Sequence, residues 1–485
     1  MAAVFATRPR ARQVAMVTLS IALLFSLPRP ARAGGLFLPF HGVRGLGRGG
    51  AFIAGADDPG GIWYNPATID RAGKIQILVD GAMIFYGMDY TRVDSGGNTL
   101  STVSNLAPPM PIPTIAVTAP IWKKRLWIGG SFSAGSGVLP SYSRPNYGPC
   151  DMGAMNSCID TAHADAPQRY SVISFSGTLF LRLDLSIAWR AFDWLTLGVS
   201  FQDMIGRLSQ TKAISSYNGT LSSGPEDPDF DSLIDVKMSS IFNPSAQFGA
   251  TIRPHSRVTV GVALQLPTTI SGDAELAVQL PVSPMYAAST VEGRDAEVSL
   301  GFPLSLGVGV EVRPPWVEHL RVEADFYFEN WASVGDIRFA PKNIRILDLP
   351  GVGTFEIPVT HDDFGYRNSF SVRLGAEYAL PVLGRAIVLR AGYGFERGAT
   401  PIESTSLVSA DFNKQLFSLG ASYRYGRFRF DAGFGILVTP RRFVSHETSR
   451  ALQINVINAQ NTVAVGGGTY KISSVMLGLG VNVAL

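Results

Sequence analysis

The chain has 485 residues, of which 46% are hydrophobic and only 16% are charged. Soluble globular proteins usually carry about 25% charged residues, so this composition is poor in charge for a soluble protein. A formal net charge of +3 gives no indication of a nucleic-acid partner. No cluster of cysteine and histidine has metal-ligand spacing, so no metal or other cofactor is expected.

Residues 1–33 have the features of a secretory signal peptide. Three arginines precede an apolar run from Gln13 to Leu27, and the small-residue sequence "ARA" ends the segment. The run is shorter than the stretch of about 20 residues that a transmembrane helix needs. We therefore predict export with cleavage after Ala33, the alternative being a disordered tail or a buried helix. Removing the five arginines of this segment turns the formal charge of +3 into −2.

The next segment matches G-x-G-x-x-G through Gly45, Gly47 and Gly50. A dinucleotide-binding loop must follow a strand and open a helix within a βαβ unit. Here the glycines come soon after the predicted cleavage site and precede a chain with strand patterning only, so we predict no nucleotide binding. Residues 34–73 lack strand alternation and are rich in glycine and alanine, which favours a compact plug over a loose tail.

The two cysteines, Cys150 and Cys158, lie close together in a polar stretch. Exported proteins mature in an oxidising environment, so a local disulfide within this loop is predicted over free thiols.

From Lys74 onward the hydrophobic pattern has a period of two. Each of the clearest segments places apolar residues on one face and polar residues or glycine on the other; these are residues 320–329, 370–380, 387–395, 428–437 and 475–485. Successive side chains of a strand point to opposite faces, so the pattern predicts strands with one fully apolar face.

The connections between these strands alternate between short and long. The short ones fall at about 122–125, 191–194, 252–257, 313–318, 380–385 and 424–428, and the long ones at about 88–111, 139–168, 203–233, 270–295, 329–366, 397–413 and 438–469. Six short and seven long connections join 14 strands. Short turns at one end and long loops at the other are typical of bacterial outer-membrane barrels.

Tryptophan placement separates a membrane barrel from a soluble β-sandwich. Five of the seven tryptophans flank short turns, namely Trp122, Trp127, Trp189, Trp194 and Trp316. Indole rings settle at membrane–water interfaces, whereas a sandwich would bury them in mid-strand. The sequence therefore predicts an all-β fold, a 14-stranded antiparallel transmembrane barrel over residues 74–485 with residues 34–73 as an N-terminal hatch inside the lumen.

The stretch "GVRGLGRGGAFIAGADDPGGIWYNPATID" resembles the N-terminal region of the FadL/TodX family of outer-membrane transporters. The matching residues are Gly45, Gly47, Gly50, Ala54, Asp57, Asp58, Tyr64, Asn65, Pro66 and Ala67. Two later segments, "VEADFYFENWASV" and "LRAGYGFERGATPIESTSLVSADFNKQLFSLGASYRYG", are similar to late strands of that family, whereas residues 139–300 match by topology only. The resemblance implies a 14-stranded barrel with an N-terminal hatch that imports long-chain fatty acids or aromatic hydrocarbons.

A carboxylate on such a ligand would need an arginine in the lumen, because bidentate charge-assisted bonds orient it. The inward-facing candidates are Arg182, Arg321, Arg373 and Arg390. The alternative is that they fill a polar lumen by pairing with the acids of the same faces, Asp184, Glu323, Asp325 and Glu377.

Three features interrupt otherwise regular strands: Pro267, Pro303 and the glycine-rich segment 129–137. Proline lacks the N–H that a strand ladder requires. Such a defect would open a lateral exit from the lumen to the bilayer, or would mark only a strand end or bulge.

The function predicted on these grounds is passive, saturable uptake of hydrophobic small molecules by a monomer in contact with outer-membrane lipid and lipopolysaccharide. The alternatives are a general diffusion porin, which would lack a plug, and a structural or adhesion barrel with long outer loops. An enzyme is not expected, because the six histidines fall in the plug, turns or loops and no G-x-S-x-G or H-E-x-x-H motif occurs.

Overall fold

A computed structural model describes residues 40–134, 140–143, 166–219, 224–381, 386–458, 460 and 462–485. All of these residues belong to one compact unit, Arg32–Leu485. The predicted signal peptide and the cysteine pair Cys150 and Cys158 lie outside the described residues, and both remain predictions. No helix in the described part of the chain is long and apolar enough to cross a membrane.

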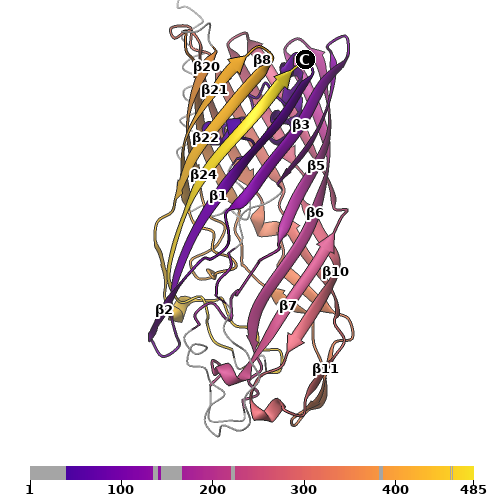
Figure 1. The fold of residues 1–485 in the computed structure, drawn as a ribbon, viewed down its shortest axis with the longest axis vertical. Coiled ribbons are helices and arrows are strands. Elements are labelled where there is room, and N and C mark those ends of the chain that lie inside the picture. Colours follow the sequence, from indigo (N-terminus) through magenta and orange to yellow (C-terminus); the bar gives the residue numbers. More distant parts are fainter. Residues whose placement is uncertain are drawn as a thin grey trace, which may run out of the picture. The chain divides into compact units, whose positions relative to one another are not determined.

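Fourteen strands of the described residues form a closed antiparallel ring (Figure 1). In ring order they are β1 (Gln76–Val93), β3 (Met110–Trp122), β4 (Leu126–Ala134), β5 (Leu179–Phe192), β6 (Leu195–Ser215), β8 (Pro244–His255), β9 (Val258–Gln265), β13 (Ser305–Val312), β14 (Leu320–Glu329), β19 (Ser369–Ala379), β20 (Ile387–Glu396), β21 (Lys414–Tyr425), β22 (Phe428–Val438) and β24 (Gly468–Ala484). β24 pairs with β1 from Gln76 to Arg92 and closes the ring. This confirms the predicted 14-stranded antiparallel barrel.

A second set of strands extends the wall away from the short turns. From the second half of β6 it runs through β7 (Asp231–Ser240), β10 (Thr268–Gln279), β12 (Asp295–Phe302), β15 (Ile337–Pro341) and β18 (Thr360–Asp362). We call these five strands the outer tier; β7 and β10 are labelled at the lower right of Figure 1.

The remaining strands and the short 3-10 helices lie in the long connections. β2 (Thr99–Ser104) pairs with β1, and β23 (Arg442–Val444) pairs with β24. A separate three-stranded sheet contains β11 (Thr290–Glu292), β16 (Arg345–Leu349) and β17 (Gly353–Glu356). The 3-10 helices here are η2 (Pro228–Phe230), η3 (Pro284–Tyr286), η4 (Trp331–Ser333) and η6 (His446–Thr448).

The ring strands and the outer-tier strands are successive parts of the same chain segments, interrupted at one level of the wall. The interruptions are residues 241–243, 266–267, 303–304, 330–336 and 363–368. Pro267 and Pro303 lie in two interruptions that face each other, because Gln265 pairs with Ser305 and Thr268 with Phe302. Proline is tolerated there because no ladder hydrogen bond is lost.

The polarity of the two faces reverses across these interruptions. On β10, Ile270 and Leu276 are buried inside the wall, whereas Ser271 and Asp273 are exposed outside. On β13, by contrast, Val308 and Val310 are exposed outside, and Glu311 is buried inside. An apolar outer face suits lipid and a polar one suits water, so the hydrocarbon belt covers the ring strands and ends at the interruptions.

This reversal explains where the sequence prediction failed. The connections predicted at 203–233 and 270–295 contain the second half of β6, the start of β7 and most of β10. Their polar residues predict a loop because these segments lack an apolar outer face, yet in the structure they are strands whose apolar residues face inward. The six predicted short connections, by contrast, coincide with the turns of the ring.

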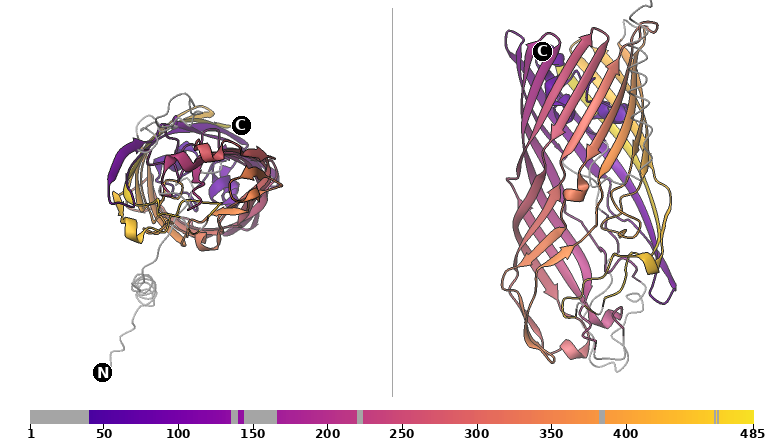
Figure 2. Two further views of the ribbon diagram at one scale, coloured as in Figure 1. Left: turned by 90° about the horizontal axis from the view of Figure 1, so that it is seen from below. Right: turned by 180° about the vertical axis from the view of Figure 1, so that it is seen from behind.

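The segment before β1 lies inside the ring (Figure 2, left). It contains α2 (Val43–Gly47), α3 (Gly61–Tyr64) and the 3-10 helix η1 (Pro66–Ala72). We call residues 40–73 the hatch. The predicted bounds of 34–73 remain a prediction, because residues 34–39 lie outside the described part of the chain.

Four of the five tryptophans near short turns are exposed on the outside of the ring. Trp122, Trp189, Trp194 and Trp316 expose 55%, 50%, 51% and 81% of their surface. Trp127 is instead buried and packs in one cluster with two isoleucines of the hatch, so its predicted place at the membrane interface is wrong. It follows Leu126 at the start of β4, where the alternation of the strand turns it inward.

We expect Val308→Arg to lower the free energy of unfolding by about 2–4 kcal/mol, the cost of a lipid-facing arginine near the bilayer midplane. Ser271→Arg on the outward face of β10 should change it by less than about 0.5 kcal/mol, as a surface substitution does. Urea unfolding in phospholipid vesicles measures both. Equal destabilisation by the two variants would contradict this membrane boundary.

Candidate functional site

Glycines on the inner wall allow the hatch backbone to approach the strands closely. A Cβ atom built on any of them would come within 3.0 Å of a hatch atom; they are Gly129, Gly198, Gly249, Gly261, Gly307, Gly309, Gly375, Gly392, Gly420, Gly433 and Gly478. At Gly392 the added carbon would overlap the backbone of Arg48 and Gly49. Glycine is required wherever two backbones meet without room for a side chain.

The residues that carried the family resemblance shape the hatch itself. Asn65 caps η1 by accepting the N–H of Ala67 at 3.0 Å, and its amide donates to the carbonyls of Ile53 and Ala250. Pro66 occupies the first turn of η1, where its missing N–H costs nothing. These contacts explain why the sequence Asn-Pro-Ala follows the second helix of the hatch.

The three glycines of the formal nucleotide motif also have packing roles. Gly45 lies against the hydroxyl of Tyr64, and Gly47 lies against the backbone of Gly420 on β21. Gly50 has a φ of 80°, which glycine tolerates and other residues rarely adopt. The motif thus builds a buried turn of the hatch.

A network of buried ion pairs joins the hatch to the wall. The hatch contributes Arg44, Arg48, Asp57, Asp58 and Arg71, and the wall contributes Glu311, Arg321, Glu323, Glu377, Arg390, Arg429 and Asp431. Arg44 donates to both oxygens of Glu377 at 2.7 and 2.8 Å, and Arg429 donates to Asp58 at 2.6 Å. We call this the hatch network.

Two carboxylates of β14 bind the hatch backbone as well. Asp325 accepts the N–H groups of Phe52 and Ile53, and Glu323 accepts those of Ala54 and Gly55. Four successive amides of an irregular segment are thereby satisfied by the wall. A buried amide without a partner would be costly, so these acids fix the path of the hatch.

The electrostatics of the hatch follow from these pairs. Burial alone would raise the pKa of Asp57, but the guanidinium groups of Arg321 and Arg44 hold it well below its ordinary value. The pKa of Asp58 is likewise lowered, by Arg429 and Arg44 against the effect of burial. Burial lowers the pKa of His41 well below its ordinary value, and the nearby charges of Arg182 and Arg373 lower it further, so its imidazole is neutral at pH 7.

A cavity lies next to the hatch, on the side that faces away from the short turns. It holds about 840 Å³ of space between atoms, part of it open to solvent. Phe40, His41, Trp63 and Tyr64 of the hatch form part of its lining. The wall residues include polar ones such as Gln202, Asn243, Gln247 and Gln265, together with Ala263, Phe302 and Pro303. We call it the hatch cavity.

Aromatic rings and cations alternate around the hatch cavity. The guanidinium of Arg182 lies 3.7 Å from the centre of the Trp63 ring, and the ring of His41 stacks against the same indole. The guanidinium of Arg373 lies 4.1 Å from the centre of the Tyr327 ring. Such cation–π contacts leave the edge of the guanidinium free to donate.

Of the predicted arginines, three pair with carboxylates. Arg182 pairs with Asp184 at 2.7 Å, Arg390 with Glu377 at 2.6 Å, and Arg321 with Asp57, Glu311 and Glu377. These three therefore belong to the packing of the lumen and the hatch.

Arg373 differs from the other arginines. It exposes only 7% of its surface, yet within the described residues it has no carboxylate within 4 Å, whereas every other buried arginine there has one. The two acids of the same lining are engaged elsewhere: Glu329 accepts from the indole of Trp331, and Asp203 accepts the N–H of Asn243. Arg373 is thus the one buried arginine of the described residues without a direct ion pair, and the nearby acids Glu329 and Glu396 attract it only from beyond that distance.

Two further polar atoms of this lining lack a hydrogen-bond partner among the described residues. They are the Nδ1 atom of His41 and the hydroxyl of Tyr327. Buried polar atoms are normally satisfied, so a cluster of orphaned groups around one cavity marks a place where a ligand or water binds.

A second, apolar cavity lies within the outer tier. It holds about 490 Å³, part of it open to solvent, and its lining includes Ile234, Val236, Leu276, Phe339 and Ile454. It adjoins the large apolar cluster that fills the space inside the outer tier. The inner face of the wall is therefore apolar between the hatch cavity and the far end of the outer tier, and ionic between the hatch cavity and the short turns.

Several parts of this site were not found from the sequence. The inward glycines were visible as a glycine face, but their role depends on which strands surround the hatch. The pairing of Arg44 with Glu377 joins residues 333 positions apart, and no local pattern indicates it. The described residues contain no group of three or more histidine, cysteine or acidic side chains that could hold a metal ion.

We expect Gly392→Val to displace the hatch, because its side chain would occupy the space of the Arg48–Gly49 backbone. Ion conductance in planar bilayers should increase several-fold. Gly81→Ala is the control, since its Cβ would meet only the carbonyl of Ile112 at an ordinary 3.8 Å. Unchanged conductance in the Gly392 variant, with the barrel folded, would contradict the docking of the hatch on these glycines.

We expect Glu323→Ala to release residues 54–55, because it removes the carboxylate that accepts their two backbone N–H groups and leaves Arg48 buried without its closest partner. Breaking a buried pair costs about 3 kcal/mol or more, so amide hydrogen exchange of these residues should accelerate by about 100-fold. Mass spectrometry of the hatch peptide measures it. Glu297→Ala, on the outer face of β12, should leave the exchange unchanged, and equal exchange in both variants would refute the role of Glu323.

The comparisons with known proteins agree with this architecture. The family model "Outer membrane protein transport protein (OMPP1/FadL/TodX)" matches residues 176–483. A FadL homologue from Pseudomonas aeruginosa has a similar structure, with 17% identity, a TM-score of 0.68, and 93% of this chain and 100% of that chain covered. No curated protein sequence matches.

Two toluene transporters also have similar structures. For TbuX from Ralstonia pickettii the identity is 18% and the TM-score 0.60, with 92% of this chain and 99% of that chain covered. For TodX from P. putida the values are 15% and 0.61, with the same coverage. The family match extends over more than half of the sequence, and the chain therefore belongs to the OMPP1/FadL/TodX family of transport proteins of the bacterial outer membrane.

Proposed function

We propose that this chain takes up hydrophobic molecules that carry a single carboxylate, by passive and saturable transport across the outer membrane. Family membership supports an outer-membrane channel without enzymatic activity. Solved structures with a similar fold are described as a FadL homologue, toluene transporters and a monoaromatic hydrocarbon channel. Those descriptions leave open whether the ligand of this chain carries a charge.

The observation that carries the proposal is the unpaired charge of Arg373. A buried guanidinium without a carboxylate is costly unless another anion satisfies it. A ligand carboxylate at Arg373 would accept bidentate hydrogen bonds from it, while the ring of Tyr327 keeps the guanidinium in place. A purely hydrocarbon ligand would leave Arg373 with only the longer-range attraction of Glu329 and Glu396.

The apolar part of the ligand has a separate place. The apolar cluster and the cavity of the outer tier lie inside the wall, beyond the hatch cavity. Each methylene removed from water there contributes about 0.8 kcal/mol to binding. We therefore assign capture of the hydrophobic chain to the outer tier and recognition of the carboxylate to Arg373, with Arg182, Arg321 and Arg390 holding the lumen and the hatch together.

The hatch argues against the alternative of a general diffusion porin. Its backbone lies against inward glycines of strands around the ring, and the hatch network joins it to the strands from β13 to β22. An open polar pore would need this segment to be absent or displaced. A structural or adhesion barrel would need neither a buried arginine without an ion pair nor an apolar interior in the outer tier.

The remaining predictions stand as parts of this proposal. We propose that the chain is exported with cleavage after Ala33, acts as a monomer, and contacts lipopolysaccharide through the outward polar face of the outer tier. The residue pair Asp273 and Lys342 on that face is exposed and joined by an ion pair at 2.9 Å.

The test compares two ligands that differ only in the head group. Arg373→Gln should weaken binding of a long-chain fatty acid about 10- to 100-fold, since a hydrogen bond to a charged group contributes about 1.5–3 kcal/mol. Binding of the fatty alcohol of equal length should not change. Calorimetry on the detergent-solubilised protein measures both affinities.

Arg207→Gln is the matched control, because Arg207 is exposed on the outer face of β6. It should leave both affinities unchanged. If wild-type protein binds the alcohol as tightly as the acid, or if Arg373→Gln weakens both equally, the assignment of the carboxylate to Arg373 is wrong. Free passage of a small sugar through wild-type protein in liposomes would favour the porin.

A further inference from the structure

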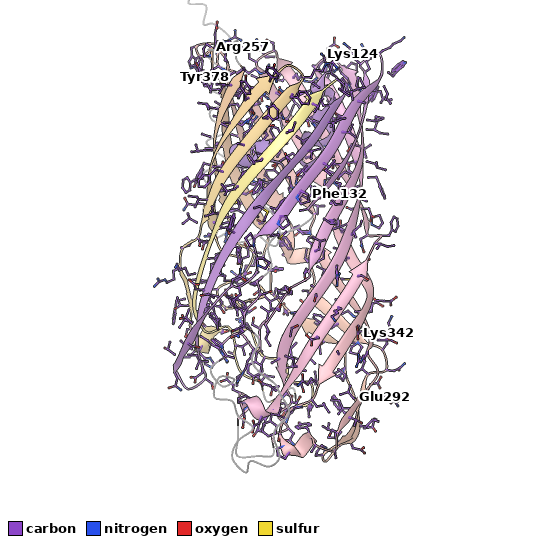
Figure 3. All side chains as sticks on the ribbon, in the orientation of Figure 1. Lys124, Phe132, Arg257, Glu292, Lys342 and Tyr378 are labelled. Atoms are coloured by element: carbon purple, nitrogen blue, oxygen red, sulfur yellow. The ribbon has the colours of Figure 1, made fainter. Side chains whose placement is uncertain are left out.

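The short-turn end of the barrel carries a dense group of cations on one side. Six of them follow one another along the rim formed by β21, β22, β24, β1, β3 and β4; they are Arg424, Arg427, Lys74, Lys123, Lys124 and Arg125. Figure 3 labels Lys124 at this end of the molecule. We call these six residues the cationic arc.

The arc is continuous and carries a net positive charge. The carbonyl of Arg427 accepts the N–H of Ala484, and the carbonyl of Ile75 accepts the N–H of Leu485, so the three segments adjoin. Residues 74–75, 121–126 and 423–428 contain no aspartate or glutamate. All six cations are exposed, and none has an ion pair within the part of the chain that the structure describes.

The turn between β3 and β4 shows that charge is retained here against local preference. Its two central residues, Lys123 and Lys124, have φ angles of 43° and 54°, and Arg125 donates to the carbonyl of Trp122 to close it. Two-residue turns with positive φ at both positions strongly favour Asn-Gly. The turn between β21 and β22, by contrast, has glycine at the one central position with positive φ, Gly426, whose φ is 59°. Residues that break a local rule mark a functional demand.

The aromatic neighbours of the arc indicate how deep it lies in the membrane. Trp122 is 55% exposed and immediately precedes Lys123, and Tyr425 is 69% exposed between Arg424 and Arg427. Amphipathic aromatic rings lie at the level of the lipid head groups. Lysine and arginine next to them extend their charged ends to the phosphates.

The opposite end of the molecule has no comparable group among its described residues. The exposed cations there include several that pair with acids, such as Arg294 with Glu275 and Lys342 with Asp273. Figure 3 labels Lys342 at that end. The excess of positive charge is thus particular to the short-turn end, which faces the periplasm in outer-membrane barrels.

We propose that the cationic arc binds the anionic head groups of phospholipids in the periplasmic leaflet of the outer membrane. Clustered lysine and arginine at head-group depth attract anionic lipid, and this attraction is independent of the transported ligand. A lipid fits better than an acidic periplasmic protein, because the interleaved aromatic rings place the charges at the membrane rather than above it. The arc would anchor the side of the ring where β24 meets β1.

The test measures lipid selectivity at this end of the barrel. The protein is reconstituted in vesicles that mix phosphatidylcholine with phosphatidylglycerol, one of the two being brominated, and quenching of tryptophan fluorescence reports which lipid is adjacent. Trp122, Trp189, Trp194 and Trp316 lie exposed at the short-turn end and report on it. We expect a several-fold preference for phosphatidylglycerol that decreases at high salt.

The variant K123N/K124G/R125Q removes three charges while supplying the residues that the turn prefers, so the barrel should fold. In this variant the ratio of phosphatidylglycerol to phosphatidylcholine beside the tryptophans should approach that of the bulk vesicle, a preference of one. The charge-matched control R207Q/K237Q/R441Q, at exposed positions away from the arc, should retain the wild-type value. The variant R424Q/R427Q tests the other half of the arc if the first does not fold. A wild-type protein without preference, or a preference unchanged in both arc variants, overturns the proposal.

Discussion

Hydrocarbon offers no hydrogen bonds to a peptide group, and this constraint determines the rest of the structure. The closed ring of fourteen described strands satisfies the backbone without exposing a sheet edge, with β24 pairing to β1 along most of its length. Closure then creates an interior that must be filled. The hatch fills it near the short turns, and its irregular backbone in turn needs acceptors, which Glu323 and Asp325 supply.

Charge balance inside the ring separates the buried arginines that hold the hatch in place from one that is available to bind a ligand. Arg44 and Glu377, or Arg429 and Asp58, satisfy each other across the boundary between hatch and wall. Breaking such a pair is costly, so these groups hold the hatch in place. Arg373 stands apart because within the described residues it has no ion pair and its guanidinium lies over the ring of Tyr327. The same rule that accounts for the hatch network therefore underlies our proposal that Arg373 binds the carboxylate of a ligand.

The two ends of the barrel are built for different surroundings. Beyond the strand interruptions the wall is polar outside and apolar inside, as suits a chamber in water that shelters hydrophobic molecules. At the short-turn end the outer face is apolar up to exposed tryptophans and then strongly positive. Both differences arise because the outward-facing side chains meet lipid around the ring and water at the two ends.

The period-two pattern and the spacing of turns by themselves determined the strand number, the antiparallel ring and the lipid-facing side chains, because each depends on residues close in sequence. They also placed Arg182, Arg321, Arg373 and Arg390 on the inner face. The tertiary structure alone decided which of these arginines has a carboxylate, which inward glycines meet the hatch, and that Trp127 is buried. Those contacts join segments up to hundreds of residues apart, and their geometry is fixed only when the ring closes around the hatch.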